Sequence, residues 1–297
     1  MTALAFLAVS FMLCWSWIKD SSPKKPELKN HAIFNFSVTF VSLIAAALAL
    51  YNGWFGVTGK VGLLILPIIT GLISILLLSP EYRNALKKRD PWIFMLFYAI
   101  TFGGFVGMSG SVAFILNGQY GFDPVTCGML MSLLSFTGAI IRPIGGWIAD
   151  RIGGVRLLLA TLASIAIFDY LLGFMVPPAV IGIPLLWGLF ASFGLGNGAV
   201  FQLVPLRWPR ATGMATGLIG AAGGVGGFYL SSTMGLAMEF TNSYGPGYLI
   251  FGTIALIAFL ALLKLKDGYM EWGYVGHDDD IVPISQRVIN NDRLIQE

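Results

Sequence analysis

Long apolar stretches separated by short polar connectors fill most of this 297-residue chain. A helix needs about 20 consecutive, mostly apolar residues to cross the hydrocarbon core of a bilayer. Stretches of this kind lie at 1–18, 33–52, 61–80, 91–116, 125–148, 154–175, 179–205, 212–238 and 246–264. The connectors hold residues that stop a helix, such as the Pro177-Pro178 pair. The pattern predicts an all-α, polytopic transmembrane bundle of about nine helices.

The composition agrees with a membrane protein and excludes an ordinary water-soluble one. Of the residues, 56% are hydrophobic and 11% are charged, whereas a soluble globular chain carries roughly 25% charged residues. Cys14 and Cys127 fall within predicted helices, where we expect them to pack, and both histidines fall in connectors. We therefore expect no metal and no cofactor. A membrane enzyme is disfavoured, because no convergent nucleophile, base or metal set is present.

Lysine and arginine are distributed unevenly between the two sets of connectors, and these residues concentrate in short cytoplasmic loops of membrane proteins. If the first helix runs from outside to inside, the outer connectors hold only Lys60. The inner connectors then hold Lys19, Lys24, Lys25, Lys29, Arg83, Lys87, Lys88, Arg89, Arg151, Arg156, Arg207, Arg210, Lys264 and Lys266. The asymmetry supports nine helices and predicts a multi-pass protein of the cell membrane with a cytoplasmic C-terminus.

The run GAIIRPIGGWIADRIGGVR at 138–156 carries the first specific signal. It resembles the loop between the second and third helices of each six-helix half in the major facilitator superfamily. The resemblance implies that Asp150 and Arg151 form a cytoplasmic latch that links neighbouring helix ends in one transport state. A charged pair can also simply end a helix, but the flanking glycines and the cytoplasmic placement favour the resemblance.

Further runs narrow the resemblance to the nitrate/nitrite porter family of that superfamily. They are LFYAITFGGFVGMSG at 96–110, GAIIRPIGGWIADR at 138–151, GLGNGAVFQLVP at 194–205 and GLIGAAGGVGGF at 217–228. In this order they resemble the first, second, fourth and fifth helices of the family's C-terminal half, over about residues 91–266. The resemblance implies transport of nitrate or nitrite, by uptake or by nitrate/nitrite exchange, with the lipid bilayer and the anion as partners and no nucleic acid.

Arg142 is the strongest candidate for a substrate-binding residue. It lies eight residues before Asp150, about 12 Å from the predicted cytoplasmic end of its helix, and so inside the bilayer. A charge there costs roughly 2.5–3.5 kcal/mol on insertion scales, and neither Asp150 nor Asp169 is an obvious counter-charge. The planar guanidinium fork suits the oxygen edge of nitrate or nitrite, and the resemblance places a substrate-binding arginine here. Snorkelling or capping of helix carbonyls is the alternative.

Two aromatic residues are candidates for the same site. Tyr98 and Phe102 lie four residues apart and therefore share a helix face. By resemblance they border the anion, where they could sandwich a flat ion while the tyrosine hydroxyl donates a hydrogen bond. Ordinary packing is the alternative interpretation.

Glycines and one asparagine complete the predicted binding set. The stripe at 217–227 includes Gly220, Gly223 and Gly224, which either allow close helix packing or let the backbone approach a small ion. Asn197 offers an uncharged donor within the membrane, either to a neighbouring helix or to a ligand.

Asp169 departs from the family pattern. An intramembrane carboxylate is either a proton relay or a side chain that reaches the outer interface. The sequence position favours the interface, and a proton-relay role remains open.

The predicted organisation has three parts. Residues 1–90 hold three helices, which resemble the end of an N-terminal half followed by a two-helix insertion. Residues 91–266 resemble a complete C-terminal half, and 267–297 form a polar cytoplasmic tail. Since such transporters rock two six-helix halves around a central site, we expect this chain to need a further half, for example on a separate chain. Transport of another small solute and a non-transporting subunit or remnant are the alternatives.

Overall fold

The computed structural model describes residues 80–209 and 211–270, two short strands in the tail, and the helical residues 37, 38, 41, 44 and 45. Its helices are α5 (Pro80–Leu86), α6 (Arg89–Tyr120), α7 (Pro124–Ile152), α8 (Gly154–Met175), α9 (Ala179–Arg207), α10 (Thr212–Thr241) and α11 (Gly245–Met270). Helices α6 to α11 coincide with the six apolar stretches predicted from residue 91 onward, and those predictions are confirmed. The stretches 1–18, 33–52 and 61–80 lie outside the described residues, apart from the few named above.

One short helix and one pair of short strands were not expected from the pattern. The polar connector at 79–90 contains the seven-residue helix α5, whose last residue, Leu86, accepts a hydrogen bond from the Trp92 indole N–H at 2.7 Å. In the tail, β1 (Tyr274–Val275) pairs antiparallel with β2 (Ile281–Val282). Neither element is long enough to cross a bilayer.

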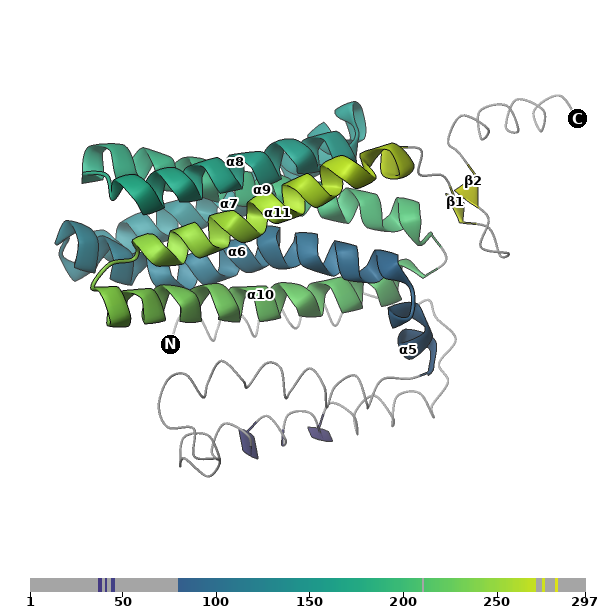
Figure 1. The fold of residues 1–297 in the computed structure, drawn as a ribbon, viewed down its shortest axis with the longest axis horizontal. Coiled ribbons are helices and arrows are strands. Elements are labelled where there is room, and N and C mark those ends of the chain that lie inside the picture. Colours follow the sequence, from purple (N-terminus) through teal and green to yellow (C-terminus); the bar gives the residue numbers. More distant parts are fainter. Residues whose placement is uncertain are drawn as a thin grey trace, which may run out of the picture.

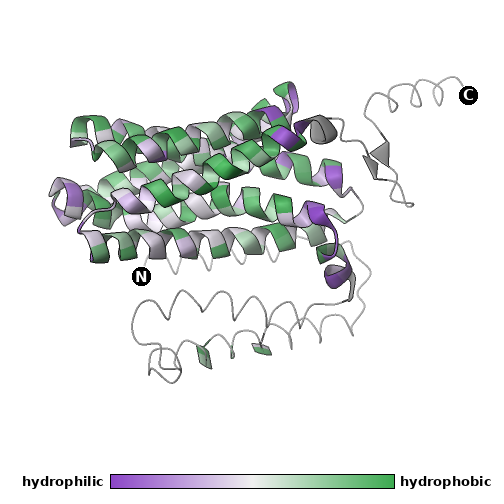
Figure 2. Cartoon of the chain, viewed as in Figure 1, coloured by the Kyte–Doolittle hydropathy of each residue, from purple (hydrophilic) through white to green (hydrophobic). Residues whose placement is uncertain are grey.

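Six helices, α6 to α11, are long and apolar enough to span a membrane within the described part of the chain. They lie side by side as a bundle (Figure 1). Hydrophobic residues run along the length of the bundle, and hydrophilic ones gather toward its ends (Figure 2). Large apolar side chains such as Phe114, Phe136 and Phe174 are more than 60% exposed on its surface, which suits lipid contact and not water.

Local sequence signals set the turns between helices. Gly121 adopts the left-handed conformation, with φ of 68°, directly after α6. The side chain of Asp123 then accepts hydrogen bonds from the backbone N–H groups of Val125 and Thr126, and Pro124 occupies the first position of α7. The chain therefore reverses direction within three residues.

Small residues let neighbouring helices approach closely. A Cβ atom added at Gly103 of α6 would lie 2.8 Å from the backbone of Gly226 in α10, and one at Gly145 of α7 would lie 2.6 Å from the Leu195 carbonyl oxygen in α9. At Gly173 of α8 it would lie 2.8 Å from Leu249 of α11. The bundle is thus built from the close pairs α6–α10, α7–α9 and α8–α11.

Basic residues gather at one end of the bundle, where α6, α8 and α10 begin and α7, α9 and α11 end. Within the described residues, the lysines and arginines at this end are Arg83, Lys87, Lys88, Arg89, Arg151, Arg156, Arg207, Lys264 and Lys266. Here Arg207 at the end of α9 forms an ion pair with Asp90 at the start of α6. We call this the basic end, and the opposite end, with the turns after α6, α8 and α10, the distal end.

Candidate functional site

Arg142 lies in the middle of α7, ten residues or about 15 Å from the helix end at Ile152. Its backbone lies against α9, because Gly198 has no side chain to hold the Arg142 carbonyl away. Its side chain is half-buried. Among the described residues, no carboxylate forms an ion pair with it. The substrate-binding role of Arg142 remains a prediction.

Aromatic rings surround the Arg142 guanidinium in place of a carboxylate. Its Cζ atom lies 5.1 Å from the centre of the Phe201 ring on α9 and 5.8 Å from the centre of the Phe102 ring on α6. The Tyr98 hydroxyl also interacts with the guanidinium. The electron-rich ring faces attract the cation but do not accept the directional hydrogen bonds that its five N–H groups can donate.

Tyr98 and Phe102 do not sandwich an ion between them. Their rings stack directly on each other, with centroids 5.0 Å apart and planes inclined by 11°, because a four-residue step places them one helical turn apart. The stacked rings leave no room for a flat anion between their faces. Tyr98 is buried and also meets Phe201 edge-on at 4.9 Å. The stacked pair therefore packs beside Arg142 on one side.

The three candidate glycines of α10 differ in their surroundings. A Cβ atom added at Gly223 would lie 2.6 Å from Phe102 and 2.7 Å from Tyr98, whereas one added at Gly220 or Gly224 would meet no described residue within 4 Å. Gly223 thus abuts the stacked pair, and no described side chain covers Gly220 or Gly224 on the same helix. Four helices, α6, α7, α9 and α10, therefore contribute to the surroundings of Arg142.

A cavity of about 470 Å³ opens beside Arg142 between α7 and α9, toward the basic end. Its lining comprises Arg142, Pro143, Gly146, Asp150, Gly198, Phe201, Gln202, Pro205 and Leu206. Phe201 and Gln202 were not predicted as site residues, although they lie within the run GLGNGAVFQLVP. The spacing of 198, 201, 202 and 205 could have found them, because these positions share one helix face.

Asn197 directly precedes Gly198 in the sequence of α9. It is buried, and its Oδ1 atom forms no hydrogen bond with a described residue. That oxygen is an acceptor, so it does not decide between the two partners expected for the amide donor. A bond to a neighbouring helix and a role in lining a ligand site both remain predictions.

The two residues of the predicted latch lie at the basic end as expected, but not as an ion pair. Arg151 stacks over the ring of Trp147, with Cζ 3.8 Å from the ring centre. Asp150 is exposed and borders the cavity. Within the described residues, the ion pair at this end is Arg207–Asp90. The latch role of Asp150 and Arg151 remains a prediction.

Asp169 corrects the expectation that it reaches the outer interface. Its side chain is completely buried within the bundle, and neither carboxyl oxygen has a hydrogen-bond partner among the described residues. The reason is its register, since it continues the buried stripe of Leu158, Leu162 and Ile165 at steps of three and four residues. That spacing was visible in the sequence and could have predicted the burial.

Comparison with known proteins decides the family. The family model described as Major Facilitator Superfamily matches residues 1–231. The chain belongs to the major facilitator superfamily. As a member of this superfamily, it is a multi-pass membrane protein, and the described helices α6 to α11 agree with that.

Several superfamily members named for nitrate or nitrite are similar to this chain. The probable nitrate/nitrite transporter NarK2 of Mycobacterium tuberculosis is 34% identical over 181 residues, covering 60% of this chain and 46% of that protein. The nitrite extrusion protein of Bacillus subtilis is 30% identical over 184 residues, covering 61% and 45%. The nitrate/nitrite transporter NarU of Escherichia coli is 31% identical over 185 residues, covering 53% and 40%. These names confirm the resemblance to nitrate/nitrite porters.

The chain spans less than half the length of these relatives. In transporters of this superfamily, two halves enclose a central site. That residues 91–266 form one such half remains a prediction.

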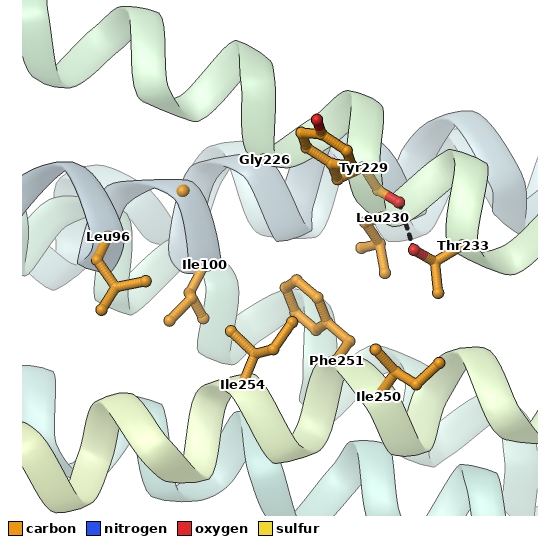
Figure 3. A pocket seen from close by; sticks show the side chains of 10 residues that line it. Leu96, Ile100, Gly226, Tyr229, Leu230, Thr233, Ile250, Phe251 and Ile254 are labelled. Atoms are coloured by element: carbon orange, nitrogen blue, oxygen red, sulfur yellow. Dashed lines mark hydrogen bonds between the residues drawn. The ribbon is translucent and has the colours of Figure 1, made fainter. Parts of the chain in front are cut away.

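A second cavity in this superfamily member is lined mostly by apolar residues. It measures about 220 Å³ and lies between α6, α10 and α11 (Figure 3). Leu96, Ile100 and Ile254 are among its lining residues, and the Thr233 hydroxyl beside it donates to the backbone carbonyl of Tyr229. No charged residue lines this cavity. It therefore offers no positive charge to an anion, and Arg142 marks the better candidate site.

Proposed function

We propose that this chain forms the half of a nitrate/nitrite transporter that binds the anion at Arg142. The observation that carries the proposal is the guanidinium held between Phe102 and Phe201 with no carboxylate partner among the described residues. The names of the similar transporters support nitrate or nitrite as the anion.

The chemistry of binding follows from the donors around the cavity. Arginine presents parallel N–H donors in a rigid plane, which match two oxygens of a planar oxyanion. The Tyr98 hydroxyl interacts with the guanidinium and holds it in place. In a site shielded from water, such charge-assisted hydrogen bonds are stronger than they are in bulk solvent. Nitrate or nitrite then neutralises a cation that would otherwise be costly within the membrane.

Transport by this site requires a second half, carried either on a longer form of the same polypeptide or on a separate chain. Two halves that rock against each other would expose Arg142 to each side of the membrane in turn. The basic end is proposed to face the cytoplasm, because lysines and arginines concentrate there. With that orientation the C-terminus is cytoplasmic, and Asp150 and Arg151 lie on the cytoplasmic side.

The substitution Arg142→Lys tests the site. It keeps the charge but removes the planar fork. In proteoliposomes that contain this half together with a second half, we expect nitrate/nitrite counterflow to fall by about tenfold or more, the equivalent of losing a charge-assisted hydrogen bond of ~1.5 kcal/mol or more. Arg156→Lys, an exposed change at the basic end, is the matched control and should leave counterflow unchanged.

Undiminished counterflow in the Arg142→Lys protein would overturn the site. Competition with unlabelled nitrate, nitrite, chlorate and an unrelated solute defines the substrate class. If the unrelated solute competes and nitrate does not, the alternative of a transporter for another small solute is correct. Absence of counterflow with and without a second half would favour a non-transporting subunit.

A further inference from the structure

The cavity beside Arg142 contains a second side chain that can donate hydrogen bonds to an anion. It is Gln202 of α9, which lines the cavity together with Arg142. On the same helix, Gly198 packs against the α7 backbone at the Arg142 carbonyl and at Gly146. Gln202 lies about one helical turn beyond Gly198, and α9 ends at the basic end. Gln202 therefore lies between the level of Arg142 and the basic end, toward which the cavity opens.

The amide oxygen of Gln202 is turned toward the start of α8. A Cβ atom added at Gly154, the first residue of α8, would collide with Oε1, so the absence of a side chain there makes room for this oxygen. Oε1 is buried and accepts no hydrogen bond from a described residue. The first turn of a helix carries N–H groups without intrahelical acceptors and a partial positive charge. This environment favours the oxygen of the amide over its nitrogen.

The amide nitrogen is the end of Gln202 that the cavity can reach. Nε2 is not buried, and it donates no hydrogen bond to a described residue. This NH₂ group has two N–H donors and no acceptor. Among the residues that line the cavity, the side chains that carry N–H donors are those of Arg142 and Gln202. An anion in the cavity can therefore receive side-chain hydrogen bonds from α7 and from α9.

The acidic side chain of the cavity disfavours an anion at the mouth. Asp150 is exposed and borders the cavity eight residues beyond Arg142 on α7, toward the basic end. Its carboxylate repels an anion, whereas the guanidinium attracts one. The inner part of the cavity, between Arg142 and Gln202, is therefore the favoured position for an anion.

Nitrate and nitrite differ in the number of oxygens that they present to these donors. Both ions are planar, and the parallel N–H donors of arginine match two oxygens of such an ion. Nitrite has no further oxygen, whereas nitrate has a third one that the arginine fork leaves free. A site with a donor for this third oxygen favours nitrate, because the donor is left unpaired when nitrite binds.

We propose that Gln202 determines the preference for nitrate over nitrite by donating a hydrogen bond from Nε2 to the third nitrate oxygen. This inference rests on the proposed function, since it requires the anion to bind at Arg142. In this arrangement Arg142 binds both anions, and Gln202 distinguishes between them.

The substitution Gln202→Leu tests this role, because leucine has a similar size and donates no hydrogen bond. In proteoliposomes that contain this half and a second half, unlabelled nitrate and unlabelled nitrite each compete with the counterflow of labelled nitrite. We expect the apparent affinity for nitrate to fall by about five- to tenfold and that for nitrite to change by less than about twofold, as for the loss of one hydrogen bond to nitrate. The ratio of the two affinities does not depend on the amount of folded protein.

Gln119→Leu is the matched control. Gln119 lies on α6 at the distal end, where it donates to the Tyr120 hydroxyl at 3.2 Å, and it is not among the residues that line the cavity beside Arg142. It should leave the ratio of affinities unchanged.

Three results would overturn the role of Gln202. In Gln202→Leu, an unchanged affinity for nitrate, or a fall for nitrite as large as that for nitrate, contradicts the inference and leaves the site at Arg142 standing. If the wild type moves neither anion, the proposed function fails and the role of Gln202 fails with it.

Discussion

At the scale of single residues, a half-buried cation can be stabilised by aromatic ring faces or by hydrogen-bond acceptors, and the two act differently on Arg142. Each cation–π contact contributes about 0.5–2 kcal/mol, which offsets part of the roughly 2.5–3.5 kcal/mol that insertion scales assign to a charge at the bilayer centre. Ring faces cannot satisfy five directional N–H donors, however. Phe102 and Phe201 therefore hold the guanidinium in position without accepting its directional hydrogen bonds, which suits the anion site proposed above.

Gly223→Ala is a prediction at this scale. The added Cβ atom would lie 2.6 Å from Phe102 and 2.7 Å from Tyr98, so the stacked rings must move away from Arg142. We expect a loss of about 1–3 kcal/mol in the free energy of unfolding, as for other overpacked sites, and weaker nitrate binding by calorimetry on the purified protein.

Gly235→Ala is the matched control on the same helix. Its added Cβ atom meets none of the described residues within 4 Å, and alanine favours a helix by up to about 1 kcal/mol over glycine. It should leave nitrate binding unchanged and the helix slightly more stable. Equal effects of the two substitutions would refute the steric explanation.

At the scale of helices, capping residues and turns next to a helix help to set where it begins and ends. Glycines then allow particular helices to pack closely together. The α7 start is the clearest case. The Thr126 hydroxyl, together with backbone N–H groups, donates hydrogen bonds to the Asp123 carboxylate and lowers the pKa of that group. Because the charged form is the better acceptor, the cap depends on pH.

The sign of that dependence follows from the lowered pKa. The folded pKa of Asp123 lies below its value in the unfolded chain, so its contribution is present above the unfolded value of about 3.9 and is lost as pH falls through the folded value. We expect Asp123→Ala to lower the thermal unfolding midpoint in detergent at pH 7. This difference from wild type should shrink as pH falls below about 4.

Asp123→Asn provides the control for this cap. Its amide oxygen still accepts the backbone hydrogen bonds, so it should retain most of the stability at pH 7. A difference between wild type and Asp123→Ala that is the same at every pH would show that charge has no part in the cap.

At the scale of the whole molecule, contacts between distant parts of the chain hold the basic end together. The Arg207 Nε atom donates to Asp90 at 2.7 Å across 117 positions of sequence, and Phe94 packs edge-on against Trp208 at 4.9 Å. The two side chains of the ion pair are 14% and 22% exposed, so solvent screens the pair only in part. The contact joins the start of α6 to the end of α9, the two helices that carry Tyr98 and Phe201.

A double-mutant cycle with Arg207→Met and Asp90→Asn measures this contact. We expect each single change to destabilise the protein, and the coupling free energy between them to be about 1–2 kcal/mol in detergent unfolding, between the values of exposed and fully buried pairs. Arg156→Met, an exposed change at the same end, should have little effect. A coupling near zero would mean that other contacts hold α6 and α9 together.

The sequence alone determined the membrane class, the six described spans and the family resemblance, because each rests on local information. Apolar stretches of sufficient length, Pro177-Pro178 and the Asp123-Pro124 cap act over a few residues. The position of Arg142 within a spanning helix was also predictable, since it lies inside a long apolar stretch.

Only the tertiary structure decided which side chains meet. The stacking of Tyr98 on Phe102 excluded an ion between them, and Phe201 joined the site through a contact between α6, α7 and α9. The burial of Asp169 against α11 and the Arg207–Asp90 pair likewise depend on helices distant in sequence. Helical periodicity indicates which face of a helix is buried, but the partner across that face is set by three-dimensional packing, where glycines permit close approach.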